Sequence, residues 1–356
     1  MSASRGRSLR LTIFGESHGS AIGAVLDGVP AGTVIDMDSI RFEMSRRASS
    51  LSMSTPRREP DIPEILSGVL NGRATGAPIA AIIKNTDTRS VDYAALKNLP
   101  RPGHADYTAH VKYSGFNDRR GGGHFSGRLT APLVFAGAIA RAILSGFGIS
   151  VISHISEIGG IKDTPFDAVA PALPEGFYQR RLPVIDETAG LDMANAVAKA
   201  STDGDSLGGI VECAAVGLIP GLGEPFFDSV ESVLSAALFS IPAIKGIEFG
   251  AGFGMAKMTG STANDAFIIK DGDIATATNN NGGINGGITN GMPLIFRCAI
   301  KPTPSISSEQ QTVNLETMQK QTISISGRHD ACIVPRALAA IEAATALCLG
   351  DMLLWR

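Results

Sequence analysis

The chain has 356 residues, 44% of them hydrophobic and 18% charged, which is enough for a substantial core and indicates no extended disordered tail. A formal net charge of −3 gives no global case for binding nucleic acid or an anionic membrane, so any basic site must be local. This length fits two average domains or one large one.

The cysteines and the N-terminus favour a soluble cytoplasmic protein. The four cysteines are far apart and form neither a CxxC pair nor a zinc spacing, so we expect free thiols in a reducing compartment. The first residues contain too short an apolar run for a signal peptide, and no segment is expected to reach a membrane-spanning length. No metal-ligand spacing such as HExxH occurs, so no metal is expected.

The chain begins with two short apolar runs. Residues 9–14 and 21–26 are predicted to be strands joined by the turn GESHG, which makes a hairpin whose tip presents Ser17 and His18. A lone histidine in a turn is more often a hydrogen-bonded structural residue than a catalyst, so position alone leaves the role of His18 open.

A helix and two further strands follow. The helix is predicted over residues 36–47, with two arginines in its last turn, where cations suit the helix dipole. Residues 48–61 are polar and show no periodicity. Residues 65–70 and 77–83 are predicted to be strands around a short turn.

Residues 101–130 form the most unusual stretch. They hold three of the six histidines and four arginines, and a triple glycine comes directly before His124. The stretch has neither the alternation of a half-buried strand nor the 3.6-residue period of an amphipathic helix. Cations, imidazoles and bare backbone this close together favour a loop that grips an anionic ligand and moves protons near it. The alternative is a surface loop whose charges are simply solvated.

The second half of the chain mixes helices and strands without a strict βαβ rhythm, which favours an α+β fold. Helices are predicted at residues 131–144, 187–202, 230–238 and 335–349, and strands at 149–155, 210–216, 247–253 and 294–300. The run NNNGGINGG is a second concentration of bare backbone. It either brings N–H groups together on an anion or a ring carbonyl, or forms a long turn.

The residue patterns exclude several common chemistries. No GxxxxGK[ST] and no GxGxxG between a strand and a helix occurs, which disfavours ordinary ATP and dinucleotide folds. No GxSxG elbow is present. The patterns therefore indicate only an enzyme for a phosphorylated, multiply anionic ligand, with histidines as proton carriers.

Six motifs together resemble the chorismate synthase family. They are GESHG at 15–19, RPGHADYT at 101–108, DGDSLGG at 203–209, NNNGGINGG at 279–287, KPTPS at 301–305 and GRHD at 327–330. They occur in the family's order and span nearly the whole chain.

The resemblance implies one catalytic domain over residues 1–356, with sheets sandwiching helices, assembled as a homotetramer. It implies a lyase of the shikimate pathway, which leads to aromatic amino acids. The reaction is an anti-1,4-elimination of phosphate from 5-enolpyruvylshikimate 3-phosphate to give chorismate. The family needs reduced FMN although the reaction has no net redox change. NADPH is the candidate reductant, and the sequence does not decide whether the chain reduces its own flavin.

The same resemblance assigns roles to individual residues. His104 is expected to serve the departing phosphate as an acid and His18 to protonate or stabilise reduced flavin, while Ser17 and Asp330 form a relay at the flavin nitrogen. The arginines expected at the substrate are Arg46, Arg47, Arg101 and Arg128. The expected flavin contacts are His124, Phe125, Ser126, Pro242, Ala243, Gly286, Lys301, Pro302, Thr303, Pro304, Ser305 and Arg328.

Three departures from the family pattern stand out. After the triple glycine, His124 and Phe125 replace the first residues of the family's Arg-Ser-Ser-Ala-Arg-Glu-Thr run. Residues 51–53 lack a further arginine that relatives often carry. Pro242 replaces an asparagine, which removes a side-chain donor at a flavin contact.

Two other functions are compatible with the motifs. One is a flavin-independent phosphate-ester hydrolase that uses His18 and His104 as acid and base. The other is a flavin- or nucleotide-binding module without catalysis.

Overall fold

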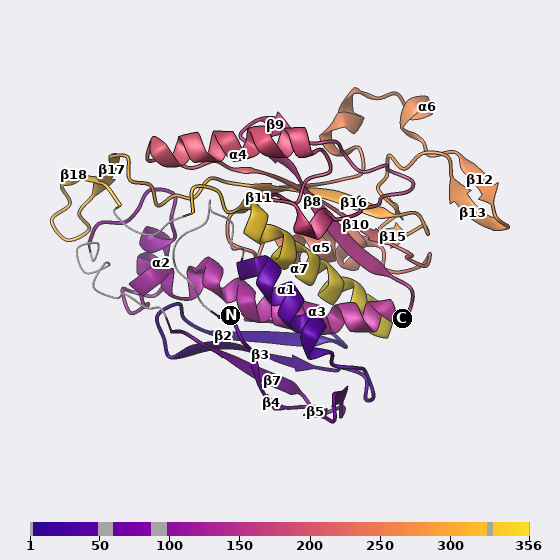
Figure 1. The fold of residues 1–356 in the computed structure, drawn as a ribbon, viewed down its shortest axis with the longest axis horizontal. Helices are drawn as coiled ribbons and strands as arrows, with labels where there is room; N and C mark the ends of the chain where they lie inside the picture. Colours follow the sequence, from indigo (N-terminus) through magenta and orange to yellow (C-terminus); the bar gives the residue numbers. More distant parts are fainter. Residues whose placement is uncertain (1–2, 49–59, 87–97, 326–329, 356) are drawn as a thin grey trace.

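The computed structural model describes residues 3–48, 60–86, 98–325 and 330–355 (Figure 1). The helices are α1 Met37–Ala48, α2 Asp106–Lys112, α3 Thr130–Ser145, α4 Glu187–Thr202, α5 Val230–Leu238, α6 Gly260–Ala263 and α7 Val334–Trp355. The strands are β1 Ser4–Arg5, β2 Arg10–Gly15, β3 Ala21–Asp27, β4 Glu64–Ser67, β5 Val69–Leu70, β6 Arg73–Ala74, β7 Ile79–Lys84, β8 Ser150–Ile158, β9 Ile161–Lys162, β10 Gly209–Val216, β11 Ile244–Phe249, β12 Phe267–Lys270, β13 Asp273–Thr276, β14 Ile284–Asn285, β15 Ile288–Thr289, β16 Leu294–Ile300, β17 Gln310–Val313 and β18 Lys320–Ile323.

The first sheet has the strand order β1-β2-β3-β7-β4, and each neighbouring pair is antiparallel. Alternate residues of β7 are buried, so one face of this strand covers the core. Strands β2 and β3 pair from Arg10 opposite Asp27 to Gly15 opposite Ile22, which confirms the predicted hairpin.

The second sheet has the order β11-β16-β10-β8-β9 and is also antiparallel. Its central strands β10 and β16 are almost wholly buried. Helices cover its inner face, and α4 lies over its outer side in Figure 1. A small apolar cluster of Phe166, Ala214 and Ile295 packs under the connection that precedes α4.

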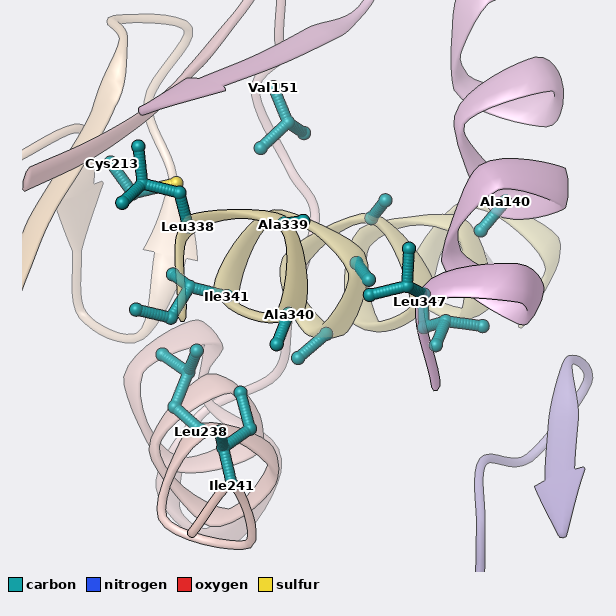
Figure 2. Close-up of a cluster of buried hydrophobic side chains, with 14 of the residues drawn as sticks. Ala140, Val151, Cys213, Leu238, Ile241, Leu338, Ala339, Ala340, Ile341 and Leu347 are labelled. Carbon is teal, nitrogen blue, oxygen red and sulfur yellow. The ribbon is translucent and has the colours of Figure 1, made fainter. Parts of the chain in front are cut away.

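The helices α1, α3 and α7 lie between the two sheets (Figure 1). Helix α7 contacts α3 so closely that a Cβ on Gly137 would lie 2.2 Å from the Cβ of Ala343, so this crossing requires glycine. Figure 2 shows Leu238 near α7 on one side, with Val151 and Ala140 on others. Burying each large aliphatic side chain here contributes about 1.5–3 kcal/mol. The arrangement confirms the predicted α+β fold with helices between sheets.

A buried ion network joins these layers. Glu342 of α7 accepts hydrogen bonds from Arg46 (2.6 and 2.8 Å), from Arg141 (2.9 Å) and from the Ser153 hydroxyl (2.6 Å). Burial disfavours the charged carboxylate, but the two arginines outweigh it and hold the pKa of Glu342 below its ordinary value. Because partners surround Glu342, the network ties α1 and α3 to α7.

Two predicted strands differ from the structure. The run 65–70 is broken by Gly68, whose φ is +83°, so β4 pairs with β7 while β5 pairs with β6. The run 247–253 is shifted, because β11 ends before Gly250 (φ +55°) and residues 252–257 form a 3-10 helix. The hairpins β12–β13 and β17–β18 were not predicted, since their short strands are mostly exposed and carry no apolar alternation.

The expectation that residues 101–130 form one loop is wrong. Helix α2 spans Asp106–Lys112, and short 3-10 helices follow at Arg120–Phe125 and Gly127–Leu129. Only Ala109 of α2 is buried, so the helix buries no apolar stripe that a periodicity search detects.

Two helical stretches, Gly127–Ser145 and Val334–Trp355, are long and apolar enough to cross a membrane by length and composition, which corrects the expectation of none. In the folded chain, 67% and 83% of their most apolar windows are buried inside the protein. They are the core helices between the sheets. The four cysteines are buried and unbridged, as expected.

Candidate active site

The turn between β2 and β3, residues 16–20, sets Ser17 and His18 at the hairpin tip. Ser17 is fully buried and His18 is 9% exposed. The side-chain amide of Asn85 donates to the carbonyls of Glu16 (3.0 Å) and Gly19 (2.9 Å) and so fixes the turn. This turn is called the Ser-His turn below.

The triple glycine Gly121–Gly123 lies directly against this turn. Its residues have φ values of 58°, 84° and 55°, a left-handed path that glycine adopts without steric cost. A Cβ on Gly121 would lie 2.1 Å from Cε1 of His18, and one on Gly122 would lie 3.3 Å from Nε2 of His104. The bare backbone therefore lies between the two predicted catalytic histidines and brings them into one site.

His104 is held by a charged pair on the same segment. Its Nδ1 lies 2.7 Å from Oδ1 of Asp106 and 3.1 Å from an Arg101 guanidinium nitrogen. Arg101 also donates to both oxygens of Asp106 through its side chain, at 2.8 and 2.9 Å. Burial disfavours ionised Asp106, but the hydrogen bonds from Arg101 and His104 outweigh it, and its pKa lies well below the usual range.

The segment 301–305 follows β16 and contacts this cluster. The Arg101 guanidinium donates to the Ser305 hydroxyl (3.3 Å), and Lys301 Nζ donates to the carbonyl of Gly103. The Ser206 hydroxyl donates to the Thr303 carbonyl (2.7 Å), and so the DGDSLGG motif supports the segment from behind. The RPGHADYT and KPTPS motifs, whose Arg101 and Ser305 are 204 positions apart, thus form one wall of the site.

A second cationic cluster is connected to the Ser-His turn through Asn85. Arg47 and Arg128 both donate to the carboxylate of Asp61. Arg128 also donates to Oδ1 of Asn85 (3.0 Å), the residue whose amide holds the Ser-His turn. Two guanidinium groups on one carboxylate leave an excess positive charge, which attracts an anion.

Burial of this second cluster disfavours the charged form of Arg47. Burial, with the charge of nearby Arg336, lowers the pKa of Arg47 to about 10, although Asp61 opposes the shift. Arg336 donates to the Arg47 carbonyl (3.2 Å) and to the Asp330 carboxylate (2.8 Å). Asp330 therefore lies within the same hydrogen-bonded neighbourhood, while the predicted relay between Ser17 and Asp330 stays a prediction.

A family model described as chorismate synthase matches residues 9–354. The chain belongs to the chorismate synthase family. Members of this family are carbon–oxygen lyases.

Individual relatives agree over the full length. A chorismate synthase of Dehalococcoides mccartyi is 49% identical over an alignment of 358 residues, which covers 99% of this chain and 97% of the relative. One of Thermococcus kodakarensis is 46% identical over 353 residues, with 99% and 98% covered. A crystal structure of a chorismate synthase superposes with a TM-score of 0.78 at 30% identity, covering 99% of this chain and 93% of that one.

The chain's departure at His124 and Phe125 produces an aromatic group. The two rings lie 4.2 Å apart between centroids, and Tyr113 from just after α2 contacts His124 edge-on at 5.5 Å. The neighbouring Ser126 accepts from the backbone N–H of Arg128 (3.3 Å) and so shapes the turn into α3. At the positions after the triple glycine where the chorismate synthase pattern has polar side chains, this chain has the aromatic rings of His124 and Phe125.

Some predicted site residues lie elsewhere. The Arg46 guanidinium is bonded to Glu342 and Glu43 in the helix layer, apart from the clusters above. Gly286 lies in the β14–β15 turn, which comes before β16 in the chain. Lys301 directly follows the last residue of β16. All seven residues of β16, which span roughly 20 Å as a strand, lie between these two positions along the chain.

The remaining predicted residues are partly placed. Ala243 accepts from the backbone N–H of Lys301 (3.0 Å), which sets the Pro242–Ala243 pair beside segment 301–305. Ala243 has a φ of +77°, a left-handed conformation directly after a proline. Arg328 lies outside the described residues, as do residues 51–53.

Sequence reasoning missed the carboxylates and the amide that hold the site together. Asp106 was within the RPGHADYT motif, and its position two residues after His104 was the available signal. Asp61 and Asn85 carry no such local signal, because their partners come from distant segments. Arg336 was expected only as part of a helix.

Proposed function

We propose that this chain catalyses the elimination of phosphate from 5-enolpyruvylshikimate 3-phosphate to give chorismate. The observation that carries the proposal is the cluster of Arg101, His104 and Asp106 against segment 301–305. Within a family of known chemistry, this cluster provides a cation for an anionic group and an imidazole for proton transfer.

The proposed role of His104 is to protonate the departing phosphate. Asp106 lies at Nδ1, and Nε2 faces the triple glycine, where no described residue bonds to it. Arg101 beside it holds the phosphate oxygens, since a guanidinium matches their geometry. The second cluster, Arg47 and Arg128, serves the carboxylates of the substrate by the same argument.

His18 and Ser17 are proposed to manage a proton on the opposite side of the triple glycine, with Asp330 as the further relay member. Their burial excludes water from this side of the site. Arg46 is kept as a residue that positions α1 through its pairing with Glu342.

The residues at segment 301–305 fit an FMN molecule. The Thr303 hydroxyl is buried and has no hydrogen-bond partner among the described residues, which leaves a donor available to a polar ligand. Lys301 adds a cation for a phosphate, and the side chains of His124 and Phe125 add rings. Reduced FMN, when bound, supplies electron density transiently and recovers it, so the reaction has no net redox change.

The assembly, location and domain organisation follow the family in this proposal. One catalytic domain covers residues 1–356, in the cytoplasm, where unbridged buried cysteines are stable. A homotetramer is supported by the exposed apolar side chains of the β12–β13 hairpin, such as Phe267 and Ile274. NADPH as the reductant of the flavin rests on the resemblance alone.

An anaerobic assay with 5-enolpyruvylshikimate 3-phosphate, with and without reduced FMN, tests the proposal. We expect chorismate and phosphate only when reduced FMN is present. Phosphate release without flavin would instead establish the hydrolase alternative, and flavin binding without turnover would establish the non-catalytic module.

A further inference from the structure

Asp106 is the residue on which both Arg101 and His104 converge. We propose that Asp106 is a positioning residue that fixes the tautomer and orientation of His104 and holds Arg101 beside it. The inference rests on the proposed function and assigns a role to a carboxylate outside the residues predicted from sequence.

The two oxygens of Asp106 are divided between different tasks. Oδ2 accepts from the backbone N–H of Arg101 (3.0 Å) and from its Nε (2.8 Å). Oδ1 accepts from a terminal guanidinium nitrogen of Arg101 (2.9 Å) and lies 2.7 Å from Nδ1 of His104. A bidentate pair with an added backbone contact leaves the carboxylate little freedom to rotate. His104 is therefore oriented against a fixed oxygen.

This arrangement selects one tautomer of His104. A guanidinium only donates, so the Arg101 nitrogen 3.1 Å from Nδ1 competes with Asp106 Oδ1 for that ring nitrogen. The carboxylate contact is shorter and charged, so Nδ1 carries its hydrogen toward Asp106. In the neutral ring Nε2 is then bare, on the side of the triple glycine, and it carries the exchangeable proton only in the imidazolium form.

Asp106 also balances charge. Arg101 is buried and close to the imidazole, so it opposes the positively charged form of His104. The ionised carboxylate restores a neutral pair around the ring and permits that form. Without it, the protonated ring of His104 would face an uncompensated guanidinium.

The test compares Asp106→Asn with Asp106→Glu and with Asp38→Asn, which removes an exposed aspartate that pairs with Arg41 in α1. We expect Asp106→Asn to lower kcat about 10²-fold, with the alkaline limb of the kcat/KM profile moved to lower pH. Asp106→Glu keeps the charge and restores the alkaline limb, and Asp38→Asn behaves as wild type.

A double variant separates positioning from a general structural effect. In the His104→Ala background, Asp106→Asn is expected to cause a clearly smaller further loss than in wild type, because only its effect through Arg101 then remains. Equal fold-losses in both backgrounds, or an unchanged pH profile in Asp106→Asn, would overturn the proposal.

Imidazole ¹⁵N NMR of the full chain provides a readout that needs no turnover. Wild type is expected to show hydrogen on Nδ1 of neutral His104. The position of this hydrogen is measured in Asp106→Asn and Asp106→Glu as well, for comparison with wild type. Hydrogen on Nε2 in wild type would contradict the inference. A wild type with this tautomer but no chorismate formation would contradict only the proposed function.

Discussion

His104 and His154 each lie against an aspartate, and the contrast between their surroundings indicates what proton transfer requires of a histidine. Nδ1 of His104 lies 2.7 Å from Asp106, and Nδ1 of His154 lies 2.9 Å from Asp163. His154 also has Glu212 at Nε2 (3.0 Å) and is fully buried. The His104 side chain is 17% exposed, and its Nε2 has no described partner.

The surroundings of His154 make it a structural cation. A carboxylate at each ring nitrogen requires both nitrogens to carry hydrogen. Burial opposes the charge, but the hydrogen bonds to Asp163 and Glu212 outweigh it and raise the pKa of His154. Beyond this ring, Arg297 pairs with Glu212 (3.3 Å) and Glu248 (2.7 Å).

The carboxylates around His154 also bind the connection between β9 and α4. Glu212 accepts from the N–H of Phe166 (2.7 Å), and Asp163 accepts from those of Ile185 (2.6 Å) and Asp186 (2.7 Å). His154 therefore ties this segment to the outer face of the second sheet. The Nε2 of His104 has no described partner, which permits proton transfer, whereas both ring nitrogens of His154 are bonded to carboxylates and stabilise the fold.

The largest expected effect is on His104. His104→Ala should lower turnover by ~10²–10⁴-fold, the usual loss for a general acid, and leave FMN binding intact. Steady-state assays and flavin titration measure the two quantities. Unchanged activity would remove His104 from the catalytic residues.

His154→Gln should act in the opposite way. It leaves two buried carboxylates without their cation, so the free energy of unfolding should fall by about 3–5 kcal/mol. Denaturant titration measures this, and kcat per folded molecule should match wild type. A large loss of kcat with normal stability would contradict the structural role of His154 and would give it a role in catalysis like that proposed for His104.

Gly121→Ala should disturb the contact that brings His18 and His104, the two proposed catalytic histidines, into one site. A Cβ there would lie 2.1 Å from His18, and the left-handed backbone adds about 1–2 kcal/mol of strain. We expect kcat to fall at least about tenfold, since displaced reacting groups are sensitive to small shifts. Gly127→Ala is the matched control, because nothing lies within 4 Å of its added Cβ.

The smallest expected effect is on the pH dependence of stability. The pKa of His154 is raised in the folded state, so its stabilisation is complete below the unfolded value of about 6.5 and is lost as pH rises through the folded value. The stability difference between wild type and His154→Gln should therefore shrink from pH 6 toward alkaline pH. A difference independent of pH would mean that His154 is neutral.

Sequence reasoning predicted the local elements well and the long-range contacts poorly. Helices α4 and α5 and strand β16 have the predicted bounds, because a pattern of apolar residues fixes each of them locally. Short exposed hairpins gave no such pattern. The resemblance also indicated the fold, which the architecture confirms, whereas the roles of His18 and His104 stay predictions.

The contacts of the site depend on tertiary structure. Arg46 and Arg47 are neighbours in sequence, but successive helical residues point about 100° apart, so one bonds to Glu342 and the other to Asp61. The pairing of Arg101 with Ser305 joins segments that no periodicity connects. Such contacts arise only when the two sheets and the helices between them have packed.

Single-turnover phosphate release under anaerobic conditions tests the central distinction most directly. Reduced FMN and 5-enolpyruvylshikimate 3-phosphate are mixed with wild type, His104→Ala or His154→Gln, with each rate expressed per folded molecule. We predict at least a 100-fold slower release for His104→Ala and a wild-type rate for His154→Gln. Equal rates in the two variants would contradict the assignment of His104 as the proton donor.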